Sequence, residues 1–162
     1  MTESGALAPP SWFPDELGLA GRENLDPAHV ARYGGKMDAE AAAEVELLAG
    51  VGLGPSSTVV EFGPGAGQFT AAAAARCAKV FAVDVSPPML QRLRDKLTAG
   101  QLENVELVRG GFLSYAHRGE PADFVYSRFA LHHLLLARAS FDIIDVARSD
   151  DGFQSKYLLR AI

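Results

Sequence analysis

The stretch VVEFGPGAGQFT, from Val59 to Thr70, decides the fold. It opens with a short apolar, β-branched run that is typical of a buried strand. Glycines follow at 63, 65 and 67, and a helix-forming segment rich in alanine begins at Gln68. Glycine lets the backbone turn tightly and approach a ligand with no Cβ in the way. Taken alone, however, the Gly-x-Gly pattern would also fit an ordinary strand-to-helix turn.

The segments before this stretch predict helices. Asp26 and Pro27 make a good helix start, because the aspartate can cap the first turn and proline fits the first helical position. A second helix is expected from about Asp38 to Gly50. The first 25 residues are rich in proline and show little periodicity, so we expect an irregular lead-in (1–25) before a single domain (26–162).

The segments after the stretch alternate between strand and helix. KVFAVD, NVELVR and ADFVYS read as strands, and Ser86-Pro87 opens a helix with Leu90, Leu93 and Leu97 on one face. Such alternation predicts an α/β fold, a doubly wound and mostly parallel sheet with helices on both faces. Any ligand is expected at the carboxyl ends of the strands.

Composition narrows the classes of partner. The 162 residues carry a net charge of −5, with no basic run that would neutralise a line of phosphates, so nucleic acid is not expected. The single cysteine, Cys77, excludes a disulfide framework and a thiolate metal site, and we expect it in the core. No signal peptide and no membrane span are recognised, so we expect a cytoplasmic protein that does not bind membranes and contains no metal.

The glycine spacing and two acids describe the ligand. Residue 68 is Gln, so the third glycine of the dinucleotide fingerprint is out of place, and no Gly-Lys-Ser/Thr follows for a nucleotide-phosphate loop. Glu61, two residues before the first glycine, would oppose a pyrophosphate but attract a cation. Asp84 ends the next strand, where its two oxygens can accept from two ribose hydroxyls. Together the carboxylates describe a ribose that carries a positive charge and no phosphates.

These motifs, in this order, resemble the class I S-adenosylmethionine-dependent methyltransferases, whose fold is Rossmann-like. The resemblance extends over about residues 30 to 135, through VVEFGPGAGQFT, VFAVDVSPPML, NVELVRGGF and ADFVYSRFALHHL. It implies that Glu61 faces the methionine ammonium, Asp84 binds the ribose, and Ser127 lies below the sulfonium. It also implies that the remaining contacts to the methionine, ribose and adenine come from Gly63, Gly65, Gly67, Val85, Met89, Gly111 and Phe112.

Two features of the resemblance concern individual contacts. The family usually reads Gly-Asp-Phe after the third strand, with the acid accepting from the adenine amine, whereas this chain reads Gly110-Gly111-Phe112. One adenine contact is therefore expected to be missing. A general base is needed only for a protonated acceptor; the candidates are His132, His133 and Tyr126, with Tyr33 and His117 behind them, although each also fits a capping or packing role. Tyr33 and Lys36 fall in a segment that often covers the cofactor in such enzymes.

The C-terminal segment departs from the family pattern. By counting alone, residues 128 to 140 form a crossover helix and Phe141 to Arg148 the fifth strand. By resemblance, the same residues begin a closing antiparallel hairpin with Asp151-Gly152 at its turn. We favour the hairpin, which implies that the fifth strand and most acceptor-binding helices are missing, with the join near Leu134 to Ser140.

The expected function is S-adenosylmethionine-dependent methyl transfer to a small-molecule acceptor, with S-adenosylhomocysteine as the product. A non-catalytic S-adenosylmethionine-binding protein, or an incomplete methyltransferase, would show the same motifs without an acceptor pocket. A nicotinamide-dependent reductase is opposed by the Gly67-Gln68 spacing and by Glu61. Neither the acceptor nor the oligomeric state follows from the residues.

Overall fold

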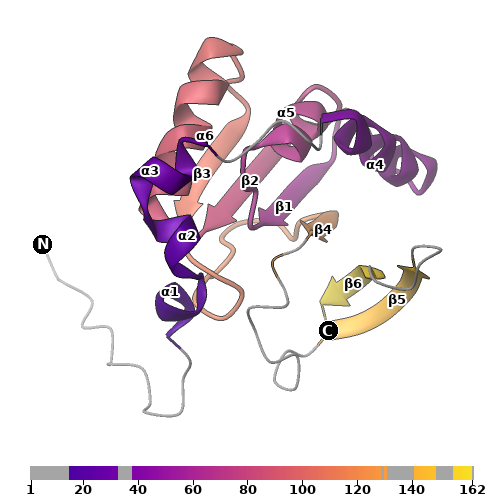
Figure 1. Ribbon diagram of the computed structural model, residues 1–162. Coiled ribbons are helices and arrows are strands. Elements are labelled where there is room, and N and C mark those ends of the chain that lie inside the picture. Colours follow the sequence, from indigo (N-terminus) through magenta and orange to yellow (C-terminus); the bar gives the residue numbers. More distant parts are fainter. Residues whose placement is uncertain (1–14, 33–37, 129, 131–140, 149–154, 162) are drawn as a thin grey trace, which may run out of the picture.

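A four-stranded parallel sheet forms the centre of the molecule (Figure 1). The computed structural model describes residues 15–32, 38–128, 130, 141–148 and 155–161. The strands are β1 (Thr58–Phe62), β2 (Lys79–Asp84), β3 (Val105–Arg109) and β4 (Phe124–Ser127), in the order β3-β2-β1-β4. The four strands agree with the predicted ones, and the Rossmann-like α/β fold is confirmed.

The strand order reverses at β1. The chain runs outward from β1 to β2 and β3, then returns to place β4 on the other side of β1. Glu61 is consequently paired with Ala82 on one neighbouring strand and with Tyr126 on the other. In open parallel sheets, ligands bind outside the carboxyl ends of the strands at such a reversal. The topology therefore places a crevice beside Glu61.

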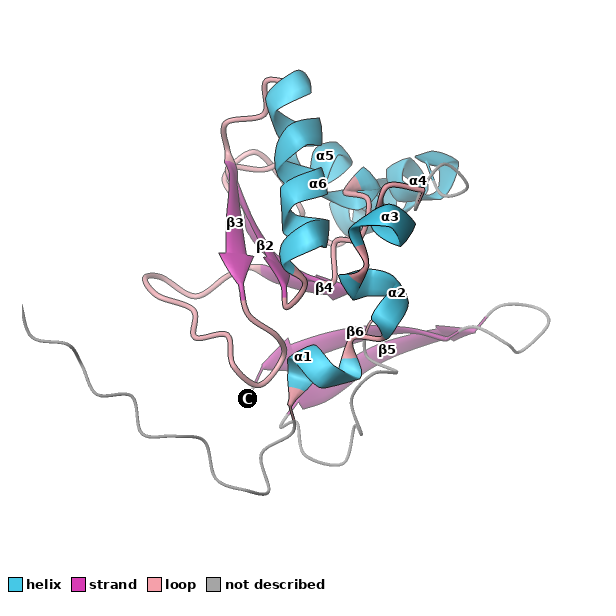
Figure 2. Ribbon diagram, turned by 60° about the vertical axis from the view of Figure 1, so that its left-hand side comes forward, coloured by secondary structure: helices cyan, strands magenta, loops and turns pink. Residues whose placement is uncertain are grey.

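The three longer helices pack on one face of the sheet: α4 (Asp38–Gly50), α5 (Gln68–Ala74) and α6 (Pro87–Ala99) (Figure 2). Val59 and Val80 lie beneath α4 and α5, whereas Ala82 lies beneath Leu93 of α6, and all four side chains are fully buried. Cys77 belongs to the same core, as predicted. Ser86 caps α6 by accepting from the Met89 N–H, which explains why that helix begins where the sequence indicates.

Aromatic side chains cover the opposite face. Phe62 of β1 stacks on Phe112 of the loop after β3, with ring centroids 4.6 Å apart, and Tyr115 meets Phe62 edge-on. Val60 and Val83 complete this cluster. The helices expected on this face are not among the described residues.

Two helical turns occur where an irregular lead-in was predicted: α1 (Glu16–Leu19) and α2 (Arg22–Leu25). α3 (Pro27–Val30) follows, and its predicted start is confirmed because Asp26 accepts from the Ala28 N–H. Turns this short are unstable alone, so tertiary contacts must hold them. The Ser86 hydroxyl donates to the Asn24 carbonyl, and Arg92 donates to two carbonyls at the end of α3.

The C-terminal strands β5 (Phe141–Arg148) and β6 (Ser155–Ala161) pair antiparallel with an irregularity between Ile143 and Asp145. They form a two-stranded sheet of their own, outside the strand order of the parallel sheet. β5 is thus not a fifth parallel strand, and closure of the parallel sheet by a hairpin is not observed. The predicted turn and the predicted join lie outside the described residues.

Candidate functional site

The glycine loop connects β1 to α5 through backbone conformations that favour glycine. Gly63, Gly65 and Gly67 have φ values of +68°, +54° and +72°. A Cβ on Gly63 would come within 2.5 Å of the Ala130 Cβ, and one on Gly67 would overlap Leu93 of α6. The loop therefore needs glycine for its left-handed turns and for two close approaches.

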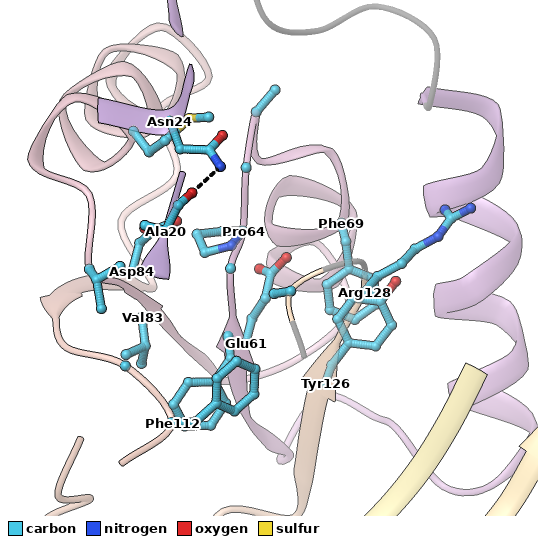
Figure 3. Close-up of a pocket in the computed structure, with 18 of the residues that line it drawn as sticks. Ala20, Asn24, Glu61, Pro64, Phe69, Val83, Asp84, Phe112, Tyr126 and Arg128 are labelled. Carbon is cyan, nitrogen blue, oxygen red and sulfur yellow. Dashed lines mark hydrogen bonds between the residues drawn. The ribbon is translucent and has the colours of Figure 1, made fainter. Parts of the chain in front are cut away.

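A pocket of about 340 Å³ lies beside this loop. Its lining includes eight of the predicted cofactor-binding residues: Glu61, Gly63, Gly65, Asp84, Val85, Met89, Gly111 and Phe112. These residues come from the carboxyl ends of β1, β2 and β3 and from the start of α6 (Figure 3). The structure thus brings together residues that the sequence spreads over some fifty positions, roughly the span of the strand-helix-strand repeats.

Glu61 is the most deeply buried acid of the pocket, with only 2% of the residue exposed. The Thr70 hydroxyl donates to its Oε2 at 2.6 Å. Burial is the main cause that raises the pKa of the Glu61 carboxyl to about 8; the Thr70 hydrogen bond opposes this rise, and the nearby carboxylates of Asp84 and Glu44 add to it. A positive ligand group here would offset both the cost of burying the ionised Glu61 carboxylate and its repulsion by the neighbouring carboxylates.

Asp84 ends β2 on the neighbouring strand. Its Oδ1 accepts from the Ser86 N–H at 2.8 Å, which fixes the carboxylate at the mouth of the pocket. Burial raises the pKa of the Asp84 carboxyl to about 6, while backbone N–H groups of Ser86 and Val85 lower it. Its other oxygen can still accept hydrogen bonds from a ligand.

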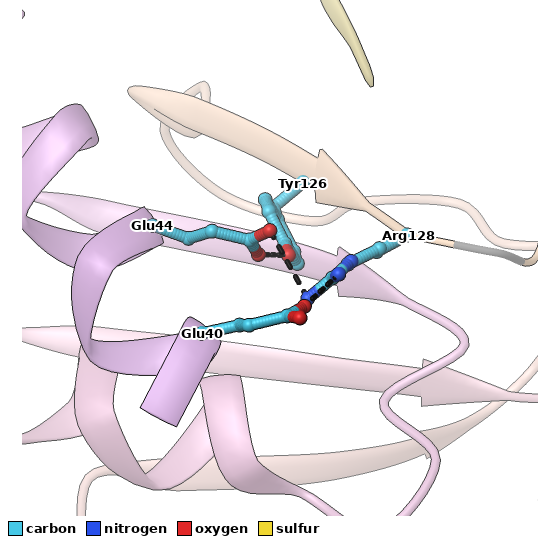
Figure 4. A network of polar contacts seen from close by, with 4 residues as sticks. All are labelled: Glu40, Glu44, Tyr126 and Arg128. Atoms are coloured by element: carbon cyan, nitrogen blue, oxygen red, sulfur yellow. Dashed lines mark hydrogen bonds and ion pairs between the residues drawn. The ribbon is translucent and has the colours of Figure 1, made fainter. Parts of the chain in front are cut away.

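A second polar group lies on the β4 side of the pocket (Figure 4). Arg128 forms ion pairs with Glu40 and with Glu44 of α4, the latter at 3.1 Å. The Tyr126 hydroxyl donates to Glu44, and the Tyr126 ring stacks on Phe69. This network joins α4 to the end of β4, so here the acids are matched by a cation.

Several predicted site residues lie elsewhere. Gly67 is the N-cap of α5 and does not line the pocket, nor does Ser127, whose buried Oγ has no hydrogen-bond partner among the described residues. His117 bonds to the Tyr115 hydroxyl and the Glu120 carbonyl instead of facing the pocket. His132, His133, Tyr33 and Lys36 lie outside the described residues.

Sequence reasoning missed the N-terminal wall and the charge network. Glu16, Leu19 and Asn24 line the pocket from α1 and α2, and Ala20 lines it from the C-cap of α1. No local pattern marks them, because their partners lie far along the chain. Glu44 and Arg128 were missed for the same reason, although an acid inside an alanine-rich helix face could have raised the question.

Two structural observations limit other kinds of site. In the part of the chain that the structure describes, no helix is long and apolar enough to cross a membrane. Within the same residues, no group of three or more histidine, cysteine or acidic side chains is arranged to hold a metal ion.

Relatives of known sequence share the core of the domain. The chain is 36% identical over 99 residues to the ribosomal RNA small subunit methyltransferase A of Pelotomaculum thermopropionicum, which covers 59% of this chain and 33% of that protein. It is 40% identical over 78 residues to an uncharacterized methyltransferase of Bacillus velezensis, covering 48% of this chain and 35% of the relative. The chain therefore spans about a third of the length of the curated relatives that it matches.

Solved structures agree on the fold. A SAM-dependent methyltransferase from Aquifex aeolicus superposes with a TM-score of 0.58 and 25% identity over 67% of this chain and 60% of that chain. A phosphoethanolamine N-methyltransferase from Haemonchus contortus, solved with S-adenosylhomocysteine, superposes with a TM-score of 0.53 over 68% of this chain and 23% of its own. At 18% identity the second likeness concerns the fold alone.

A family model described as a methyltransferase domain matches residues 59–148, more than half of the 162 residues. This match begins at the strand that leads into the glycine loop and includes every strand of the parallel sheet. The chain belongs to the S-adenosylmethionine-dependent methyltransferase family, as its motifs predicted.

Proposed function

We propose that this chain binds S-adenosylmethionine in the pocket beside the glycine loop and transfers its methyl group to an acceptor. The observation that carries the proposal is the pair of strand-end carboxylates, Glu61 and Asp84, in one pocket. Neither is ion-paired with a basic side chain among the described residues. Burying unpaired acids is costly, so their natural complement is a ligand with a cation and hydroxyl groups.

The roles follow from position. Glu61 faces the ligand ammonium, and Thr70 orients its carboxylate. Asp84 accepts from the ribose hydroxyls, with Val85 and Met89 beside the sugar and base. Gly63 and Gly65 allow the methionine part to lie against the backbone, and Phe112, held by Phe62, flanks the base.

Bound S-adenosylmethionine supplies a methyl group that is already activated for in-line displacement. The protein has to orient the ligand, exclude water and admit a nucleophile to about 3 Å. The apolar walls of the pocket and the Glu61 and Asp84 anchors serve the first two tasks. The Tyr126 hydroxyl donates to Glu44, so it is engaged in structure and is a poor candidate for a base.

For the acceptor we propose a small molecule, since twenty acidic residues outnumber fifteen basic ones and the pocket lining has four acids against Arg128. RNA is the second candidate acceptor. It is favoured by the relative of Pelotomaculum thermopropionicum, whose name states a ribosomal RNA substrate.

Calorimetry tests the binding step. S-adenosylmethionine and S-adenosylhomocysteine should bind, whereas NAD should not; binding of NAD alone would overturn the proposal. Release of S-adenosylhomocysteine is then measured with a panel of small amines, alcohols and thiols and, separately, with small-subunit ribosomal RNA. Release with small acceptors supports the proposal, release only with RNA replaces the acceptor class, and binding without release in either assay identifies a non-catalytic binding protein.

A further inference from the structure

The N-terminal turn α1 places a carboxylate over the loop that follows β3. Glu16 Oε1 accepts from the Leu113 N–H at 3.0 Å, and Oε2 accepts from the Ser114 N–H at 3.0 Å and from the Ser114 hydroxyl at 2.6 Å. These bonds join residues 97 and 98 positions apart. Glu16 is thereby fixed at the edge of the pocket that it lines.

Gly111 leaves the space that this carboxylate fills. A Cβ built on Gly111 would meet the Glu16 carboxylate, with Oε2 only 2.6 Å away. The nearest atoms to that Cβ all belong to the Glu16 carboxyl group. The acid from α1 therefore occupies the volume that a side chain at position 111 would take, and both residues line the same pocket.

The Glu16 carboxylate can accept one more hydrogen bond. A carboxylate offers about four lone-pair sites, of which the loop uses one on Oε1 and two on Oε2. No ion pair joins Glu16 to a basic side chain in the described ranges. The remaining acceptor site on Oε1 therefore suits an N–H donor of a ligand.

The surrounding wall favours a flat, apolar ring. Leu19, Val83, Val85 and Phe112 line the same pocket, and β3 is the direct neighbour of β2, whose end carries Asp84. A ligand whose ribose is held by Asp84 would extend its base along this wall. Its edge would then reach a carboxylate, which attracts an amine and repels a carbonyl oxygen.

We propose that Glu16 accepts a hydrogen bond from the exocyclic amine of the ligand's adenine and selects adenine over hypoxanthine. The inference rests on the proposed function, because it takes S-adenosylmethionine as the ligand. On this proposal, the contact that Gly111 cannot make is made by Glu16 from α1.

The test compares two ligands, S-adenosylhomocysteine and S-inosylhomocysteine, by calorimetry. Wild type should prefer the adenine ligand by about tenfold to a hundredfold, the value of a hydrogen bond to a charged group. Glu16→Ala should remove that preference by weakening the adenine ligand, with little change for the inosine ligand. The double variant Glu16→Ala/Gly111→Asp should restore the preference, because it returns an acid to the vacated volume.

Ser114→Ala is the matched control for the structural role of Glu16. It removes the two hydrogen bonds of the Ser114 hydroxyl, to Glu16 Oε2 and from the Gly111 N–H, but keeps the carboxylate and its two backbone bonds to the loop. The adenine preference should therefore stay near that of wild type. Circular dichroism and thermal unfolding verify that each variant is folded. If Glu16→Ala does not fold, Glu16→Gln replaces it in the comparison of the two ligands.

The outcomes separate the two proposals. If wild type binds neither ligand, the proposed function fails and this inference with it. If wild type binds S-adenosylhomocysteine but Glu16→Ala weakens both ligands equally, or leaves the preference unchanged, Glu16 only supports the loop. The proposed function would then stand while the adenine contact would be withdrawn.

Discussion

Glu44 and Glu61 are two buried glutamates in one pocket, and they differ in what faces them. Glu44 pairs with Arg128 and accepts from Tyr126, whereas Glu61, within the described ranges, has only the Thr70 hydroxyl and two neighbouring acids. We call Glu40, Glu44, Tyr126 and Arg128 the paired side, and Glu16, Glu61 and Asp84 the ligand side. Burial of an acid alone therefore does not indicate a ligand site. A buried acid that has no basic side chain beside it does, because a ligand can neutralise it.

The largest effect is expected from breaking the paired side. Arg128→Ala would leave the Glu44 carboxylate buried without its cation, so unfolding free energy should fall by about 3 kcal/mol in urea denaturation. Arg76→Ala is the matched control, because its ion pair with Glu46 is exposed and should contribute less than about 1 kcal/mol. Equal losses in the two variants would show that the network contributes no more than a surface pair.

On the ligand side, Asp84→Ala should reduce affinity for S-adenosylhomocysteine about a hundredfold, since two ribose hydroxyls lose a charged hydrogen-bond partner. The fold should be unchanged, because the substitution removes a partly desolvated acid. Asp95→Ala, an exposed acid on α6, is the control and should bind normally. Unchanged affinity in Asp84→Ala, measured by calorimetry, would show that the ribose does not bind at this strand end.

Glu61 should make the stability of the unliganded protein depend on pH. Its folded-state pKa of about 8 exceeds the ordinary glutamate pKa of 4.5, so the folded state holds a proton that the unfolded state releases. Stability should therefore fall as pH rises, by up to about 1.4 kcal/mol per pH unit between pH 6 and 8. Asp84, whose pKa is about 6, changes mostly below this window.

Glu61→Gln tests this assignment, since glutamine does not titrate. Urea denaturation at pH 6, 7 and 8 should give a nearly flat profile for the variant and a declining one for wild type. Parallel slopes in the two proteins would place the titrating group elsewhere.

The smallest effect is expected from Tyr126→Phe. Loss of the bond to Glu44 should cost about 1 kcal/mol of stability, because one hydrogen bond to a buried acceptor is removed while the ring still stacks on Phe69. The rate of S-adenosylhomocysteine release should change less than about threefold. A hundredfold slower rate at unchanged ligand affinity would instead support the predicted role of Tyr126 as a base.

Local patterns predicted the sheet and the centre of the site. β1 and β2 are short apolar runs with flanking turn residues, and the acid that ends each run is also the acid that lines the pocket. Helix α6 begins at the predicted cap, Ser86. In these cases chemistry and structure coincide within a few residues of sequence, which is the range that periodicity and capping rules describe.

Long-range contacts could not be predicted in this way. Tyr126 meets Glu44 across 82 positions, and Glu16 meets Leu113 across 97. The turns α1 and α2 are held by hydrogen bonds to the start of α6 and to the loop after β3. Local composition does not contain these contacts, and its prolines predicted an irregular chain instead. The second face of the sheet was assigned to helices by pattern, whereas Phe112 and Tyr115 of a loop cover it in the described residues.

The exclusion between Glu16 and Gly111 has an evolutionary consequence. The two positions share one volume, so a lineage can keep an acid at either position but not at both without moving the N-terminal turn. Substitutions there should be correlated: relatives with a larger residue at 111 should lack an acid at 16. An alignment compared position by position would indicate that the acid at position 111 has been lost. The Glu16 carboxylate, from a different part of the chain, occupies the same place.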